Sequence, residues 1–170
     1  MLGIGGKELS EENAAQTAKA LNIIQPDFIR VHATGIKLES KLGEFVRDGS
    51  FTLQSEEEIV IEQKLFLQQL HEMDSYYVNE HIVNLLLEVR GNLRTEKQEM
   101  LSTIDRFLTL PPDERLLFTV GRRLNIFFRL DDLKKPKLYQ KAGESLQQIL
   151  SKNPHVDFAA LCNYVRQSQI

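Results

Sequence analysis

The sequence predicts an α/β fold followed by an all-helical extension, on three observations. Residues 28–34 alternate between apolar and polar side chains, which is the period of a β-strand. A helix precedes this strand across a short turn at residues 25–27, and a second helix and strand follow, the order of parallel βαβ units. From residue 92 onward only helical periodicity remains. We therefore expect an α/β part at residues 1–91 and a helical extension at 92–170 that packs on it.

The first element is a glycine-rich turn that leads into a helix. Gly3, Gly5 and Gly6 allow tight backbone turns and the close approach of a ligand or neighbouring strand. Ser10 is of a type that caps helices, and the helix covers residues 11–23. Almost no strand precedes the turn, so we expect an incomplete first strand and a chain that is a fragment of a longer protein.

The next elements alternate strand, helix and strand. The strand at residues 28–34 has an apolar face of Ile29, Val31 and Ala33. A short helix follows around residues 42–46, and Ser55 and Glu58 form a capping box that begins a helix reaching about Met73. A second strand is expected at residues 75–79.

The extension consists of four amphipathic helices. Thr95 and Gln98 suggest a capping box for the first, which ends at residues 110–112, and Asp113 and Glu114 begin the second. The last two cover residues 137–151 and 157–167. A modest basic patch begins at the end of the second helix and contains Arg122, Arg123, Arg129, Phe127 and Phe128. It could contact an anion or a nucleotide, but we favour its interpretation as a solvated face beside packed aromatic rings.

Composition limits the classes of function. A net charge of -3 gives no electrostatic footprint for nucleic acid, and the longest apolar runs are far shorter than the ~20 residues of a membrane-spanning helix. One cysteine excludes an internal disulfide, and its apolar surroundings predict that Cys162 is buried and inert. Together with the lack of a signal peptide, these features predict a cytoplasmic location without membrane or nucleic-acid partners.

Several segments resemble the second half of radical S-adenosylmethionine (radical SAM) proteins, in particular uncharacterised bacterial members. The resemblance covers about residues 1–130 and rests on residues 3–10, 20–22, 26–29, 53–58, 77–86, 97–101 and 117–123. It implies half of a partial, TIM-like βα barrel with the helical extension behind it. It also implies that the strand before Gly5 helps to hold the adenine of S-adenosylmethionine.

The resemblance assigns cofactor contacts to the glycine turn, through Gly3, Gly5, Gly6 and Glu8. Many family members carry the pattern Gly-x-Ile-x-Gly-x-x-Glu at this place. Gly5 and Glu8 match its last two fixed positions, whereas Met1 and Gly3 stand at the first two. The family's cluster motif, Cys-x-x-x-Cys-x-x-Cys, is absent, and one cysteine cannot ligate a [4Fe-4S] cluster. We therefore expect the cluster only in a full-length parent, and the chain to be inactive alone.

Polar residues at the carboxyl ends of the predicted strands are the candidates for substrate contact, because chemistry in βα barrels takes place at those ends. They are Arg30, His32, Thr34, Asn79 and His81. Arg30 is suited to a carboxylate by bidentate pairing. His32 has the alternative role of a hydrogen-bonded core residue, and His81 that of a helix cap. The spacing of His71, His81 and His155 does not favour a zinc site.

Two functions follow from the sequence. The first is the C-terminal part of a radical SAM enzyme, which contributes contacts to S-adenosylmethionine and to a small-molecule substrate. The second is a non-catalytic interaction module that binds a partner chain or self-associates through an exposed sheet edge at residues 28–34.

Overall fold

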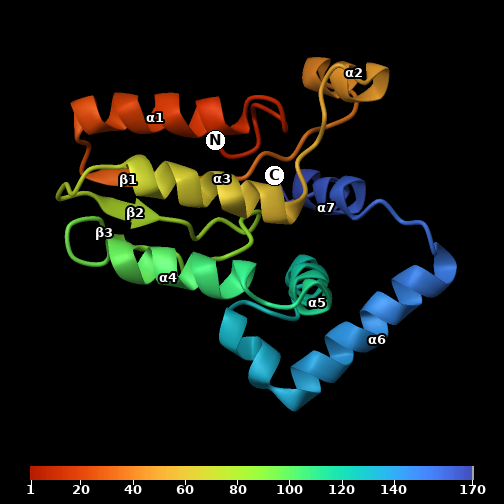
Figure 1. Ribbon diagram of the computed structural model, residues 1–170. Coiled ribbons are helices and arrows are strands. Elements are labelled where there is room, and N and C mark those ends of the chain that lie inside the picture. The colour runs from red at the N-terminus through yellow and green to blue at the C-terminus, as the bar shows by residue number, and fades with distance from the viewer. Residues whose placement is uncertain (170) are drawn as a thin grey trace.

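The computed structural model describes residues 1–169 as seven α-helices packed around a small sheet (Figure 1). The helices are α1 (Ser10–Ile24), α2 (Lys41–Asp48), α3 (Glu56–Gln69), α4 (Lys97–Leu108), α5 (Pro112–Arg123), α6 (Pro136–Lys152) and α7 (Phe158–Gln167). A 3-10 helix, η1 (Leu130–Lys134), lies between α5 and α6. The strands are β1 (Phe28–Arg30), β2 (Tyr76–Val78) and β3 (Gly91–Asn92).

The sheet has the order β1-β2-β3. Strands β1 and β2 are parallel, with Ile29 opposite Tyr77, and β3 is antiparallel to β2. Leu2 adds a parallel bridge on the other side of β1: its amide donates to the carbonyl of His32 at 2.9 Å, and its carbonyl accepts from the amide of Thr34 at 2.8 Å. Leu2 therefore lies beside the carboxyl end of β1.

Helices cover only one face of the sheet. In Figure 1, α1, α3 and α4 lie side by side next to the strands, and α3 contacts both of its neighbours. Ile29 and Tyr77 point into this helical layer and are buried, with the rings of Tyr77 and Phe66 6.4 Å apart. On the other face Phe28 is 70% exposed and Tyr76 is 41% exposed. The strands thus have one buried face and one open face.

The prediction of a partial, TIM-like βα barrel half is wrong. More than half of the described residues are helical, and each strand has two or three residues. After β2 the chain does not enter a crossover helix, which a further parallel strand would need. Residues 79–90 form an irregular loop instead and return directly as the antiparallel β3. The predicted strand at residues 28–34 is shorter than expected because β2 diverges from it after Val78.

Of the three helix caps that the sequence predicts, the structure contains one. Ser55 and Glu58 form the predicted capping box at the start of α3. Ser10 does not cap α1, because the helix begins at this residue and its hydroxyl donates to the carbonyl of Lys7. Thr95 and Gln98 do not form a capping box either: α4 begins at Lys97, and no side chain caps it.

The end of the chain returns to the middle of the molecule. Figure 1 shows α6 running diagonally away from α5, and α7 coming back to the amino end of α3. Asn163 on α7 fixes this position, because its side-chain amide accepts from the amide of Ile36 at 2.8 Å and donates to the carbonyl of Ile36 at 2.9 Å. The helical extension thereby contacts the segment that continues from β1. Within residues 1–169, none of the helices is both long and apolar enough to cross a lipid bilayer.

Candidate functional site

The carboxyl ends of β1 and β2 bring two predicted site residues into contact. The rings of His32 and His81 stack with their centroids 4.1 Å apart and an interplanar angle of 30°. Nδ1 of His81 accepts a hydrogen bond from the amide of Val83 at 3.4 Å, which leaves the proton of the neutral ring on Nε2. Arg30 precedes His32 by two residues and is exposed on the same, open face of the sheet.

The surroundings of His32 keep its ring uncharged. Burial is the largest cause that lowers the pKa of His32, and its electrostatic interactions with His81, Arg30 and the terminal amine of Met1 lower it further. Glu80, next to His81 in the chain, forms an ion pair with Arg90. Arg30 is thus the side chain with a fixed positive charge that acts on His32. At neutral pH this ring offers one donor and one acceptor to a ligand on the open face.

Asn84 holds the backbone on both sides of His32. Its side-chain amide accepts from the amide of Ala33 at 2.7 Å and donates to the carbonyl of Val31 at 2.9 Å. It also donates to the side-chain oxygen of Asn79 at 2.7 Å. The Asn84 amide thereby replaces the peptide group of a paired strand at the point where β2 has turned away. With 2% of its surface exposed, it fixes the end of β1 to the loop after β2.

Thr34 and Asn79 lie beside the histidine pair but take part in the fold. The Thr34 hydroxyl donates to the carbonyl of Leu2 at 2.8 Å, and its own carbonyl accepts from Nε of Arg166 at 3.0 Å. The side-chain NH2 of Asn79 donates to the carbonyl of Leu86 at 2.5 Å. Both residues are buried, so Arg30, His32 and His81 are the predicted substrate-binding residues that remain accessible.

Two arginines of α5 hold the loop after β2 in place. Arg122 donates to the carbonyls of Ile82 and Asn84, at 2.9 and 3.2 Å, and its guanidinium lies 5.6 Å from the ring centre of Phe128. Arg123 donates to the carbonyl of Val83 at 3.0 Å. Both arginines are buried, so their interpretation as part of a solvated basic patch is wrong. They support the loop that contains His81.

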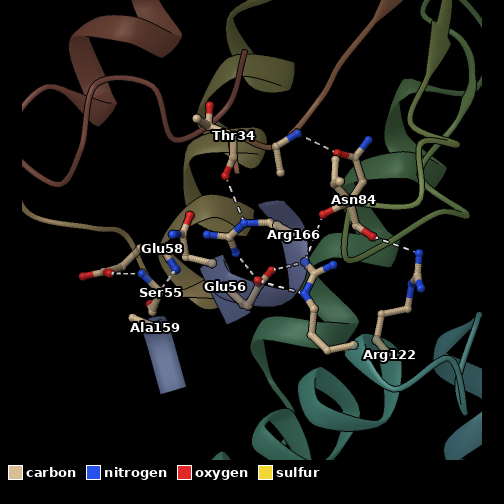
Figure 2. A network of polar contacts seen from close by, with 12 residues as sticks. Thr34, Ser55, Glu56, Glu58, Asn84, Arg122, Ala159 and Arg166 are labelled. Atoms are coloured by element: carbon tan, nitrogen blue, oxygen red, sulfur yellow. Dashed lines mark hydrogen bonds and ion pairs between the residues drawn. The ribbon is translucent and has the colours of Figure 1, made fainter. Parts of the chain in front are cut away.

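A buried carboxylate joins these parts to the end of the chain (Figure 2). Glu56, the first residue of α3, accepts two hydrogen bonds from Arg123, at 2.5 and 3.0 Å, and one from Arg166 on α7. Burial alone would raise the pKa of Glu56, but the two guanidiniums outweigh it and hold the pKa below its ordinary value. The ionised Glu56 therefore connects α3, α5 and α7 behind the site.

The glycine turn lies at the same edge of the sheet as the histidine pair. Gly3 and Gly6 have φ angles of 80° and 62°, which favour glycine. The amide of Gly3 donates to the buried carboxyl group of Glu62 at 3.1 Å, and Glu8 accepts from the hydroxyl of Thr52 at 2.5 Å. A Cβ on Gly5 would lie 2.9 Å from the carbonyl oxygen of Leu9, so this position also requires glycine.

The turn does not enclose a nucleotide. The cavity beside it, lined by Met1, Leu2 and Asn13 among others, has a volume of about 20 Å³, which is enough for a single water molecule. The outward surface of the turn remains accessible, because Ile4 and Glu8 are exposed.

Residues 1–169 do not fit an iron-sulfur cluster. Among them, no group of three or more His, Cys, Asp or Glu side chains is placed to hold a metal ion. Cys162 is 2% exposed on α7, and burial raises the pKa of its thiol to about 12. The prediction that Cys162 is buried and inert agrees with this environment. A single protonated thiol cannot replace the thiolate ligands that a [4Fe-4S] cluster needs.

Over residues 1–169 the chain is a mostly helical protein with a small three-stranded sheet, and the polar side chains of the site lie at the carboxyl ends of β1 and β2 on the face that the helices leave open. No family model, curated protein or solved structure matches the chain.

Sequence reasoning missed three residues that build the site: Glu56, Asn84 and Arg166. A faint signal existed for Asn84, an amide within the apolar run of residues 82–87. Glu56 stands in a run of three acids at the start of a helix, where negative charge is generally favourable, so its sequence position does not mark it as a buried ion-pair partner. Nothing in the helical pattern of residues 157–167 singles out Arg166.

Proposed function

We propose that this chain forms the substrate-binding part of a radical SAM enzyme and that the iron-sulfur cluster belongs to another part of that enzyme. The residues that carry substrate contact are Arg30, His32 and His81. Contacts to S-adenosylmethionine come from the outward surface of the turn at residues 3–8. The proposal rests on the resemblance over about residues 1–130 and on the geometry at the end of the sheet.

The single observation that carries the proposal is the stacked pair of His32 and His81, 4.1 Å apart. In open parallel sheets, ligands bind outside the carboxyl ends of the strands. His32 follows β1 and His81 follows the parallel β2, and both rings face the side of the sheet that α1, α3 and α4 leave open. Leu2 pairs beside Ala33, so the glycine turn reaches the same edge.

The chain's own residues would hold and orient a substrate rather than cleave a bond. Arg30 supplies a fixed positive charge with several donors. The neutral ring of His32 accepts or donates a hydrogen bond, and Nε2 of His81 donates one. Asn84, Arg122 and Arg123 keep these groups in place from behind. S-adenosylmethionine supplies the radical chemistry when a reduced cluster cleaves it, and that cluster needs thiolate ligands beyond Cys162.

Isothermal titration of S-adenosylmethionine into the iron-free, reduced chain tests the proposal. We expect saturable heat for the unmodified chain and its loss in Gly5→Val, because the added side chain meets the Leu9 carbonyl and deforms the turn. Gly143→Val is the matched control, since a Cβ on Gly143 in α6 meets no atom within 4 Å. Heat that is absent from the unmodified chain, or unaffected by Gly5→Val, would count against the proposal.

A second candidate function, docking of a protein on the open sheet face, is favoured by two exposed aromatic rings. Phe28 and Tyr76 are neighbours, with ring centroids 6.4 Å apart, and both lie on the uncovered side of β1 and β2. Light scattering after size-exclusion chromatography tests self-association through this face. A dimer that becomes a monomer in Phe28→Ser would favour it, and a monomeric unmodified chain would speak against self-association.

A further inference from the structure

We propose that the group recognised by Arg30, His32 and His81 is an oxyanion, a carboxylate or a phosphate carried by the substrate. This inference deepens the proposed function, on which it rests for the identity of the site. It is argued from the charges and hydrogen-bond donors at the carboxyl end of β1, all of which are supplied by residues of this chain.

The first argument is the sign of the charges around the site. Arg30 acts on His32 with a fixed positive charge, which lowers the pKa of the ring. Glu80, which is next to His81 in the sequence, is paired with Arg90. An anion placed here meets positive charge that the fold leaves uncompensated, whereas a cation would be repelled.

The second argument is the supply of hydrogen-bond donors. Nδ1 of His81 is used as an acceptor by the amide of Val83, so the donor at Nε2 is directed away from the loop. Arg30 adds a guanidinium, whose planar set of donors matches an oxyanion. The two rings stack at 4.1 Å, which places the donors of both histidines over a small area of the sheet.

The third argument is the rigidity of the backbone that carries these groups. The side-chain amide of Asn84 accepts a hydrogen bond from the amide of Ala33 at 2.7 Å and donates one to the carbonyl of Val31 at 2.9 Å, on either side of His32. The backbone amide of Leu2 donates a hydrogen bond to the carbonyl of His32 itself at 2.9 Å. A ligand therefore meets a site whose backbone is already ordered, and little conformational entropy is lost when it binds.

Binding and protonation at this site must be coupled. The pKa of His32 is low because burial and neighbouring positive charges disfavour the imidazolium. An anion beside the ring removes part of this penalty, so His32 binds a proton more readily in the complex. By thermodynamic linkage the anion binds more tightly as the pH falls through the His32 titration, by the same factor.

The test is a titration of the whole chain with sulfate, observed through the ring signals of its four histidines by NMR. Sulfate keeps a constant charge over the pH range of histidine titration, so changes in affinity report on the protein. We expect saturable shifts of His32 and His81, and affinity that increases as the pH is lowered from 7.5 to 5.5. His71 and His155 lie elsewhere in the fold and serve as internal controls, with sodium chloride at equal ionic strength as the control for salt.

Arg30→Gln should weaken sulfate binding about tenfold or more, the loss expected when a charge-assisted contact is removed. The matched control is Arg94→Gln, which removes an exposed arginine after β3, at the opposite end of the sheet. Equal shifts of all four histidines, or an unchanged affinity in Arg30→Gln, would overturn the inference. Acetate and methyl phosphate, titrated at pH 7.5, then distinguish a carboxylate from a phosphate by their affinities.

The sulfate titration is independent of the proposed enzyme class. Sulfate binding without heat from S-adenosylmethionine would keep the oxyanion site and overturn the radical SAM proposal. Heat from S-adenosylmethionine without a response of His32 to sulfate would keep the radical SAM proposal and overturn the oxyanion site.

Discussion

Replacement of Glu56 with glutamine should destabilise the protein by about 3–5 kcal/mol, the cost of breaking a buried ion pair by removing one partner. Glu56 is 4% exposed, and its two partners, Arg123 and Arg166, are 5% and 2% exposed. Both guanidiniums would keep their charge without a buried counter-charge. The loss is a large part of the 5–15 kcal/mol that typically separates the folded and unfolded states.

Urea and thermal unfolding measure this loss. With a dependence of about 2 kcal/mol per molar urea, the midpoint should decrease by about 1.5–2.5 M. The melting temperature should decrease by about 6–20 °C, since 1 kcal/mol corresponds to about 2–4 °C in a chain of this length. Both values assume a single cooperative transition, which calorimetry checks directly.

Glu57→Gln is the matched control, because the neighbouring carboxylate is 43% exposed and pairs with Arg115 at 2.9 Å at the surface. It should cost less than about 1 kcal/mol. Similar losses in both variants, or a loss below about 1 kcal/mol in Glu56→Gln, would show that the buried ion pairs of Glu56 are not a major source of stability.

The same carboxylate predicts part of the acid sensitivity of the fold. The pKa of Glu56 in the folded chain lies below the value of 4.5 taken for an unperturbed glutamate. The folded state therefore binds fewer protons than the unfolded state, and Glu56 contributes its full stabilisation above that value. The contribution is lost as the pH falls through the lower, folded pKa. In Glu56→Gln, this decrease in the free energy of unfolding at low pH should be absent.

Three further predictions concern single buried groups. Burial raises the pKa of Glu62, so its contribution to stability is present below about pH 4.5 and is lost as the pH rises through the folded pKa. In Glu62→Gln, the melting temperature should therefore depend less on pH in that window. The same dependence of melting temperature on pH in both proteins would contradict this. Cys162, with a pKa of about 12, should not react with a disulfide reagent at pH 8 until urea unfolds the chain, and rapid labelling of the folded protein would exclude this burial. Asn84→Leu should cost about 2–4 kcal/mol, because the Val31 carbonyl and the Ala33 amide lose their partner, and it should abolish the ring-current shifts of the stacked histidines in NMR spectra.

Features set by neighbouring residues could be predicted from the sequence. The capping box of Ser55 and Glu58 depends on residues three apart, and the structure contains it. The alternation at residues 28–34 correctly separates the buried Ile29 from the exposed Phe28, although β1 itself ends at Arg30. The burial of Cys162 follows from its apolar helical face.

Features that join distant segments could not be predicted. Glu56 meets Arg123 and Arg166 across 67 and 110 residues of chain, and no local pattern specifies those partners. The same holds for Arg122, whose helical position indicates solvent although its guanidinium binds the carbonyls of the loop after β2. The barrel prediction failed at that loop, because after β2 the chain enters no crossover helix, and the side-chain amide of Asn84 pairs with the backbone of Val31 and Ala33 beyond the end of β2.

NMR of the ¹⁵N-labelled chain, titrated with S-adenosylmethionine, would locate the cofactor site. We expect the backbone signals of residues 3–8, 30–34 and 79–81 to shift together, since these segments meet at the carboxyl ends of β1 and β2. Shifts confined to other segments, or a spectrum that does not respond to S-adenosylmethionine, would contradict the assignment of this face as the site of a radical SAM enzyme.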